Sequence, residues 1–275
     1  MVFGREVKQG DRFEFGKNWA AFLDVLDEDR IQKAEKSLCE MLEVASLEGK
    51  RFLDIGSGSG LFSLAARRLG ANVYSFDYDL RSVACTKELK RLYFIDDDHW
   101  VIERGSVLDL EYIESLGYFD IVYSWGVLHH TGAMWESIKI AATRVAAGGA
   151  GILFIAIYND QKYISRFWLL VKKLSNRGLV FKQMVKSIFY PWFTAQAVLA
   201  GCVSHYNPFG KFVEYRKNRG MSIVRDWDDW LGGYPFEVAR PEELLFFLRK
   251  LGFELINMKT TNRLGCNEMV FLKKA

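Results

Sequence analysis

The sequence predicts an α/β fold in which a mostly parallel sheet carries helices on both faces and ends in an antiparallel strand pair. The first observation is a regular alternation of short apolar strands and helical stretches between residues 51 and 158. The second is the return of a helix and two strands after residue 240, behind a long segment without this alternation. The third is size, since 275 residues, half of them hydrophobic, suit one large domain with a substantial insertion.

The predicted elements follow in order along the chain. Apolar residues recur at spacings of three and four over residues 20–47, which indicates a helix within an N-terminal helical cap of residues 1–49. Short apolar runs predict strands at 51–55, 73–76, 100–103, 119–124 and 151–158. Helices are expected between them at 61–69, 81–93 and 135–145, the first ended by Gly70. We therefore expect the sheet domain to comprise residues 50–159 and 235–275.

Residues 160–234 interrupt this pattern and are expected to form a helical insertion after the fifth strand. Its helical stretches are expected to break at Asn176-Arg177-Gly178, at Pro191 and at Asn207-Pro208. Regularity returns at Pro241, because a proline followed by acids fits the first turn of a helix. Strands over 253–259 and 268–273 then form the antiparallel hairpin that closes the sheet.

Composition narrows the class of protein. The four cysteines lie far apart and form no C-x-x-C pair, so neither a metal site nor a dithiol motif is expected. Met1 is followed by no apolar signal region, and no apolar run reaches the roughly 18 residues of a membrane span. We therefore expect a cytoplasmic protein.

The charge is unevenly distributed. Residues 160–219 carry eleven Lys and Arg against two acids, a local charge of +9, whereas the rest of the chain carries 26 basic and 32 acidic residues. The segment also repeats apolar stripes beside its basic residues. This pattern suits a cap buried on the core, a lid in peripheral contact with a membrane through residues 162–200, or an oligomer interface. It shows no stacking platform or RNA module, so nucleic-acid binding is not expected.

A glycine-rich turn follows the first strand and reads Leu53-Asp54-Ile55-Gly56-Ser57-Gly58-Ser59-Gly60. Glycines let a backbone turn tightly against a ligand, and the following helix offers unpaired N–H groups. Leu61 stands where dinucleotide-binding turns carry their third glycine. Asp54 would repel a pyrophosphate, but it suits the cationic sulfonium and amino groups of S-adenosylmethionine. The candidate cofactor residues of this turn are Asp54, Gly56, Ser57, Gly58 and Gly60.

Two further acids follow the next two strands. Asp77 ends the second strand 21 residues after Gly56, where a carboxylate can accept hydrogen bonds from both ribose hydroxyls, and Tyr78 lies beside it. Asp109 follows the third strand and is suited to accept from an adenine amino group, with Val107 and Leu108 supplying backbone and apolar contacts. The alternative for Asp109 is a helix N-cap.

These residues together resemble the class I S-adenosylmethionine-dependent methyltransferases over residues 50–158 and 240–274. The resemblance rests on the glycine turn, the order of the three acids and the terminal strand pair. The run Tyr123-Ser124-Trp125-Gly126-Val127-Leu128-His129-His130 resembles the fourth motif of small-molecule methylases, nearest to the ubiquinone-biosynthesis, polyprenyl-phenol group. The resemblance implies a Rossmann-like seven-stranded sheet, with cofactor contacts at Gly56, Asp77 and Trp125. Ser124 beside Trp125 is a further candidate.

Methyl transfer is an in-line displacement, so the protein must orient the acceptor, and it needs a base only when the acceptor holds its proton. His129 and His130 follow the fourth strand, whose carboxyl end faces the cofactor crevice. One of them is the candidate base for O-methylation. The alternative is that one stacks on the cofactor or caps the next helix.

Aromatic and polar residues elsewhere suggest contacts with the cofactor and with a small-molecule acceptor. Trp19, in an aromatic segment before the first helix, is a candidate flap over the cofactor or a residue packed at the sheet edge. The candidate acceptor residues are Tyr158, Tyr206, Trp227, Trp230, Tyr234 and Asn267.

Two other functions remain open from the sequence. One is a noncatalytic S-adenosylmethionine-binding protein or partner subunit, since binding residues alone do not prove turnover. The other, an NAD-dependent oxidoreductase, is disfavoured by Asp54 and by the glycine spacing.

Overall fold

The structure is a computed structural model that describes residues 2–16, 23, 26–205, 207 and 223–275. The chain divides into two compact units, residues 27–162 with 237–275 and residues 1–26 with 163–236. We call them the sheet unit and the helical unit. The predicted N-terminal cap, residues 1–49, is divided between the two units, and nearly all of the predicted insertion belongs to the helical unit.

The sheet unit contains the predicted seven-stranded sheet, in the order β3-β2-β1-β4-β5-β7-β6. Its strands are β1 (Arg51–Ile55), β2 (Asn72–Asp77), β3 (Trp100–Arg104), β4 (Ile121–Trp125), β5 (Ile152–Tyr158), β6 (Phe253–Lys259) and β7 (Cys266–Lys273). Strands β1 to β5 pair in parallel, whereas β7 is antiparallel to both β5 and β6. The strand order reverses between β1 and β4, and ligands bind at the carboxyl ends of strands at such a reversal.

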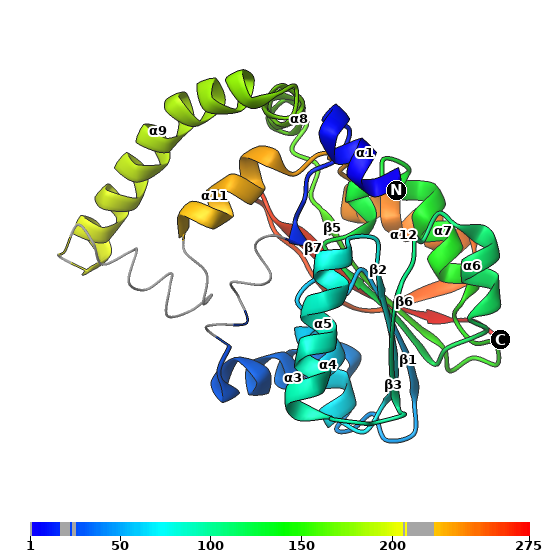
Figure 1. Ribbon diagram of the computed structural model, residues 1–275. Coiled ribbons are helices and arrows are strands. Elements are labelled where there is room, and N and C mark those ends of the chain that lie inside the picture. The colour runs from blue at the N-terminus through cyan, green and yellow to red at the C-terminus, as the bar shows by residue number, and fades with distance from the viewer. Residues whose placement is uncertain (1, 17–22, 24–25, 206, 208–222) are drawn as a thin grey trace. The chain divides into compact units, whose positions relative to one another are not determined.

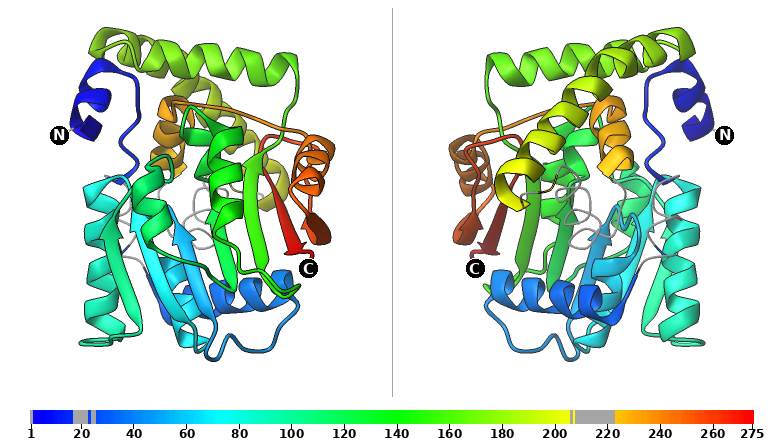
Figure 2. Two further views of the ribbon diagram at one scale, coloured as in Figure 1. Left: turned by 90° about the vertical axis from the view of Figure 1, so that its right-hand side faces the viewer. Right: turned by 90° about the vertical axis from the view of Figure 1, so that its left-hand side faces the viewer.

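Helices cover both faces of this sheet (Figures 1 and 2). One face carries α3 (Glu28–Leu42), α4 (Leu61–Arg68) and α5 (Leu80–Tyr93). The other carries α6 (Leu110–Ser115), α7 (Met134–Thr143) and α12 (Pro241–Lys250). The predicted α/β layers are therefore confirmed, with α6 as an additional short helix.

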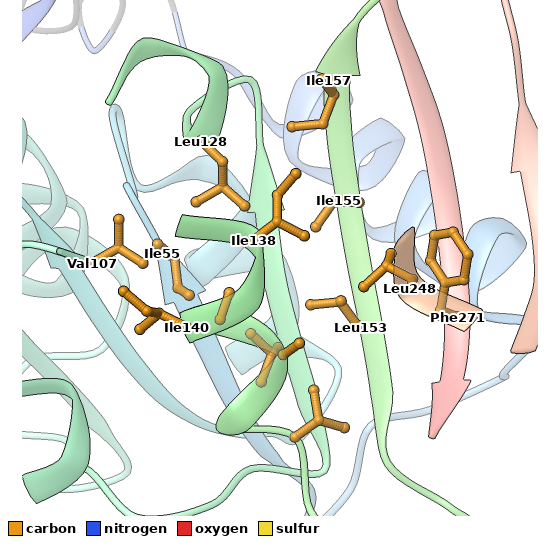
Figure 3. Close-up of a cluster of buried hydrophobic side chains, with 14 of the residues drawn as sticks. Ile55, Val107, Leu128, Ile138, Ile140, Leu153, Ile155, Ile157, Leu248 and Phe271 are labelled. Atoms are coloured by element: carbon orange, nitrogen blue, oxygen red, sulfur yellow. The ribbon is translucent and has the colours of Figure 1, made fainter. Parts of the chain in front are cut away.

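The core lies between the second face and its helices (Figure 3). Ile155 and Ile157 of β5 pack there with Leu128 and Ile138 from the segment after β4, and with Leu248 of α12. Strand β5 is apolar throughout because both of its faces are covered, as expected for a central strand of a parallel sheet. Each such buried side chain contributes about 1.5–3 kcal/mol, so this layer holds the carboxyl ends of β1, β4 and β5 in place.

The helix predicted over residues 20–47 is interrupted at residues 26–27 and ends early, while residues 20–22 and 24–25 lie outside the described residues. Asp27 is extended, and its side chain accepts the N–H of Arg30, so it is an N-cap and α3 begins at Glu28. The helix ends at Leu42 because Glu43 adopts a left-handed conformation with φ of 56°. The apolar spacing over residues 20–47 did not indicate these two helix ends, because caps depend on the local backbone and polar side chains.

The helical unit contains α1 (Val2–Gln9), α8 (Tyr163–Ser175), α9 (Leu179–His205) and α11 (Ile223–Gly232). Val171, Val185 and Leu231 form the small core where α8, α9 and α11 meet. The predicted break at Asn176-Arg177-Gly178 is confirmed, but the break at Pro191 is wrong, because α9 continues through it. Proline removes one N–H, and packing of Phe189 and Phe193 on either side holds the helix. Among the described residues, no helix is both long and apolar enough to cross a membrane.

Candidate functional site

The glycine turn joins β1 to α4 at the point where the strand order reverses. Gly56, Gly58 and Gly60 have φ of 79°, 56° and 83°, values that side chains rarely adopt. The N–H groups of Gly56 and Ser57 both donate to the carbonyl of Phe76, at 2.8 and 3.1 Å, which ties the turn to the end of β2. The turn is therefore fixed by the backbone of the neighbouring strand.

Close packing adds a second requirement for glycine in this turn. A Cβ atom at position 56 would lie 2.4 Å from Cγ1 of Val127, and one at position 60 would lie 2.9 Å from Cα of Thr86. The hydroxyl of Thr86 also hydrogen-bonds the hydroxyl of Ser57 at 2.9 Å. The sequence did not predict Val127 or Thr86 as supports of the turn, since Val127 stands out only as part of the fourth motif and no local pattern marks Thr86.

Asp77 ends β2 and faces the glycine turn. Its carboxylate accepts the N–H of Gly58 at 2.9 Å and the N–H of Asp79 at 2.8 Å. Burial raises the pKa of Asp77 to about 6, against the effect of these two N–H donors. The backbone of Tyr78 also bonds this carboxylate, which has about four lone-pair positions, so one remains for a ligand.

Asp54 lies within β1, beneath the turn rather than in it. It is buried and accepts a hydrogen bond from the hydroxyl of Ser63 in α4. The hydroxyls of Ser63 and Ser75 are 2.7 Å apart, and the indole N–H of Trp100 donates to Ser75 at 3.0 Å. Burial raises the pKa of Asp54 to about 7, because the charge of Asp77 adds to burial and the Ser63 bond only partly offsets it. Asp54 therefore supports the turn from below, and its direct contact with a cofactor stays a prediction.

The segment after β3 contains the remaining candidates for the adenine side. Asp109 is the N-cap of α6 and accepts the N–H of Tyr112 at 3.2 Å, which is the alternative that the sequence left open. Val107 is buried, whereas Leu108 is exposed. Tyr78 follows Asp77, and the guanidinium of Arg104 lies 5.8 Å from its ring centre. An adenine contact by Asp109 stays a prediction.

The end of β4 holds the fourth motif beside the glycine turn. The hydroxyl of Ser124 is buried and donates to the carbonyl of Ile55 at 3.0 Å, which links β4 to β1 directly before Gly56. Trp125 is exposed on the strand end. Ser124 therefore supports the turn through the backbone, while Trp125 is free to contact a ligand.

Both histidines lie in the 3-10 turn η1 (Leu128–His130), directly after Val127. His129 is fully buried, and the backbone N–H of Tyr158 approaches its Nδ1 at 3.4 Å. The ring centres of His129 and Tyr158 are 4.2 Å apart, and those of the two histidines are 4.4 Å apart. His130 is only partly buried. The structure therefore groups His129, His130 and Tyr158, with His130 the more accessible histidine.

A carboxylate that sequence reasoning missed stabilises this group. The backbone N–H of Glu237 donates to the carbonyl of His129 at 2.9 Å. Its side chain accepts the N–H of Met134, at the start of α7, at 3.0 Å. An anion at a helix N-terminus is favourable, so Glu237 holds the turn between η1 and α7. Only its proximity in space, across more than a hundred residues, reveals this role.

Residues 26–188 match a family described as "Methyltransferase domain", and this stretch is more than half of the chain. The chain belongs to the class I S-adenosylmethionine-dependent methyltransferases.

Curated relatives of this methyltransferase match it over shorter stretches. A "Ubiquinone biosynthesis O-methyltransferase" of Ralstonia nicotianae is 31% identical over 125 residues, which cover 43% of this chain and 48% of that protein. A "Ribosomal protein L11 methyltransferase" of Prochlorococcus marinus is 46% identical over 88 residues, 31% of this chain and 29% of that protein. The chain thus spans less than half the length of either relative.

Solved structures share the fold of this methyltransferase at low identity. Magnesium protoporphyrin IX methyltransferase from Synechocystis PCC 6803, crystallised with bound SAH, has a TM-score of 0.52 at 13% identity, over 89% of this chain and 83% of that one. An O-methyltransferase family protein from Burkholderia thailandensis has a TM-score of 0.54 at 11% identity, over 89% and 57% of the two chains. These similarities confirm the predicted fold.

The described acceptor candidates of the methyltransferase are divided between the two units. Tyr158 lies in the histidine group, but Asn267 is buried and its side-chain amide bonds Asn159 and the backbone of Thr261, which anchors the end of the β6–β7 hairpin. Trp227, Trp230 and Tyr234 belong to the helical unit. Trp227 packs on Phe193, and Trp230 on Trp168, with ring centres 5.4 and 5.3 Å apart. The backbone carbonyl of Tyr234 accepts the N–H of Phe13 at 2.8 Å. Trp19 and Tyr206 lie outside the described residues.

Proposed function

We propose that this methyltransferase methylates a hydroxyl oxygen of a small-molecule acceptor, and that His130 receives the proton of that hydroxyl. The observation that carries the proposal is the contact between Gly56 and Val127, because it sets the histidine turn directly against the glycine turn. A cofactor in the glycine turn and an acceptor beside His130 would then be neighbours. The relatives named for ubiquinone biosynthesis, which are O-methyltransferases, support oxygen as the acceptor atom.

The residues of the sheet unit fit S-adenosylmethionine. The three left-handed glycines let the backbone approach a ligand closely, and a side chain at position 56 or 60 would displace the turn, because it would overlap Val127 or Thr86. Asp77 keeps a lone pair for a ribose hydroxyl, and Trp125 presents an exposed ring at the end of β4. When bound, this cofactor supplies a methyl carbon that its sulfonium has already activated.

The protein's own contribution is orientation and removal of one proton. The buried ring of His129 packs between His130 and Tyr158 and so fixes the direction of both. A neutral imidazole can accept a hydroxyl proton, and a positioned base contributes roughly 10²–10⁴-fold. His130 would accept the hydroxyl proton as the acceptor oxygen takes the methyl group that the bound cofactor would supply, and S-adenosylhomocysteine would be the product released.

The proposal is tested by replacing His130 and measuring chemistry and cofactor binding separately. A panel of phenols and other small hydroxyl compounds is first screened by release of S-adenosylhomocysteine. On an acceptor so found, His130→Gln is expected to lower turnover by about 10²–10⁴-fold. Calorimetric affinity for S-adenosylhomocysteine should change little. His99→Gln is the matched control, because His99 lies directly before β3, at the opposite ends of the strands.

Two outcomes would count against this function. Equal turnover by His130→Gln and the parent would remove His130 as the base. Binding of S-adenosylhomocysteine without methyl release to any acceptor would favour the noncatalytic alternative. Tighter binding of NAD than of S-adenosylhomocysteine would instead favour an oxidoreductase.

A further inference from the structure

Two helices of the helical unit present large apolar side chains to solvent. On α8, the exposed face is formed by Tyr163, Phe167 and Leu170, each at least half exposed. Arg166 and Lys173 are exposed at helical spacing from them, so they share this face. The opposite face of α8 is buried, with Val171 in the small core. The exposed face of α8 therefore combines apolar side chains with basic ones.

Helix α9 has an exposed apolar face of its own. Val180, Met184, Ile188 and Trp192 follow one another at intervals of four residues, and Leu199 and Val203 continue the stripe after Ala195. All six large side chains are exposed, with Val180 and Val203 80% exposed. The residues that pack inward, Val185 and Phe189 among them, lie on the other side of the helix. We call the exposed faces of α8 and α9 the basic apolar surface.

The segment that contains α8 and α9 carries basic residues and no acidic ones. Between residues 161 and 205 the sequence contains seven Lys and Arg and no Asp or Glu. Three of the seven act within the unit: Lys172 is buried, the Lys182 Nζ lies over the ring of Phe13, and Lys186 pairs with Asp228 at 2.5 Å. Lys162 belongs to the sheet unit. The other three cations, Arg166 and Lys173 of α8 and Arg177 directly after it, are exposed, and within the described part of the chain none of the three forms an ion pair.

We propose that the basic apolar surface docks on an anionic phospholipid bilayer. Exposed apolar side chains such as Ile188 and Trp192 would enter the boundary between headgroups and acyl chains, while the three exposed cations of the helical unit would meet lipid phosphates. A bilayer with anionic headgroups matches both properties of the surface. The acidic remainder of the chain, with 32 acids against 26 basic residues outside 160–219, would be repelled from such a bilayer, which favours docking through this surface alone.

Vesicle flotation of the full chain tests this proposal. Binding to phosphatidylcholine vesicles that contain phosphatidylglycerol is expected to exceed binding to pure phosphatidylcholine vesicles, and to fall as salt is raised. A Lys or Arg near an anionic surface strengthens binding about fivefold, so the double variant Arg166→Gln, Lys173→Gln should bind about 25-fold more weakly. The double variant Ile188→Gln, Trp192→Gln should bind at least about tenfold more weakly at every salt concentration.

The matched control removes the same number of charges elsewhere. Lys87 and Lys250 are exposed on α5 and α12, and the variant Lys87→Gln, Lys250→Gln should bind vesicles as the parent does. Circular dichroism checks that each variant is folded, which is expected because every replaced side chain is exposed.

Three outcomes would overturn the proposal. The first is equal binding of the parent to vesicles with and without phosphatidylglycerol. The second is an equal loss of binding in the control and in the Arg166 and Lys173 variant. The third is a lipid-free dimer in sedimentation equilibrium that the Ile188 and Trp192 variant dissociates, since a second copy would then occupy the surface.

Discussion

Gly56 is constrained twice, by its backbone angle and by its neighbour. Its φ of 79° disfavours any side chain, and a Cβ there would overlap Val127. We therefore expect Gly56→Ala to weaken calorimetric binding of S-adenosylhomocysteine at least tenfold. It should also lower the free energy of unfolding by about 1–3 kcal/mol, a usual cost for one strained residue.

A substitution at Gly148 separates the effect of backbone strain from the effect of close packing. It also has a positive φ, of 99°, but a Cβ there would meet no atom within 4 Å. Gly148→Ala should therefore lose stability without losing affinity for S-adenosylhomocysteine. Adding Val127→Ala to Gly56→Ala should restore part of the affinity, because the overlap is removed and the strain is not. If Gly56→Ala and Gly148→Ala bind the ligand equally well, close packing at Val127 is unimportant.

Asp54 makes stability depend on pH. Its folded pKa of about 7 is raised from an ordinary value of 3.8, so the folded chain binds the proton more tightly than the unfolded chain. The contribution of Asp54 to stability is therefore greatest at low pH, and it is lost as the pH rises from about 4 to about 7. Asp54→Asn removes this dependence. Relative to the parent, the variant should gain in urea-unfolding free energy between about pH 4 and pH 8. A constant difference would contradict the raised pKa.

At the scale of elements, the apolar runs and the residues that end them predicted the bounds of the strands closely. The strand predicted at 73–76 is β2 (Asn72–Asp77), and the one at 151–158 is β5 (Ile152–Tyr158). These segments are predictable because burial on both faces demands an apolar run of limited length. The glycine turn was equally visible, since its conformation demands glycines at fixed positions.

Features that depend on distant contacts were not predictable. Pro191 lies inside α9 because packing within the helical unit holds the helix on both sides of it. Whether His129 or His130 is accessible depends on Tyr158, which arrives from the end of β5. Glu237 supports the site from a segment that no local motif marks, and the packing of Val127 on Gly56 does not follow from the motif that contains it. The sequence therefore predicted the glycine turn but did not distinguish the two histidines.

Lys172 gives α8 a testable electrostatic property. It is 1% exposed, its ammonium lies 4.2 Å from the ring centre of Trp230, and it donates to the carbonyl of the same residue. Burial lowers the pKa of Lys172 to about 7, and the nearby charge of Asp229 only partly opposes this.

The consequence is that stability rises with pH in a defined window. Between about pH 7 and pH 10 the unfolded chain binds a proton at Lys172 that the folded chain does not. The cost of burying Lys172 to the folded state is therefore smallest at high pH. Lys172→Met should have its largest advantage over the parent at or below about pH 7, and this advantage should shrink toward pH 10. Thermal unfolding of both proteins across this range measures the difference. Lys173→Met, one residue along on the exposed face, should show no such trend.

At the scale of the whole molecule, the candidate cofactor residues within the described ranges belong to the sheet unit alone. They come from the ends of β1, β2 and β4 and from the segment after β3. The helical unit instead carries the strongly basic segment and the basic apolar surface. Cofactor binding and surface docking are thus assigned to different units, which makes their effects separable.

Calorimetric unfolding of the full chain tests this separation. A ligand that binds only the folded sheet unit stabilises it by about 2.7 kcal/mol when present at a hundred times its Kd. S-adenosylhomocysteine should therefore raise the transition of the sheet unit. A transition of the helical unit is identified as the one that moves in Lys172→Met, and S-adenosylhomocysteine should leave it in place.

Because Asp77 is expected to hold the ribose, Asp77→Ala should abolish the shift caused by S-adenosylhomocysteine. NAD at the same concentration should leave both transitions unchanged. A shift by NAD alone, or a ligand-induced shift confined to the helical unit, would contradict the assignment of the cofactor to the glycine turn.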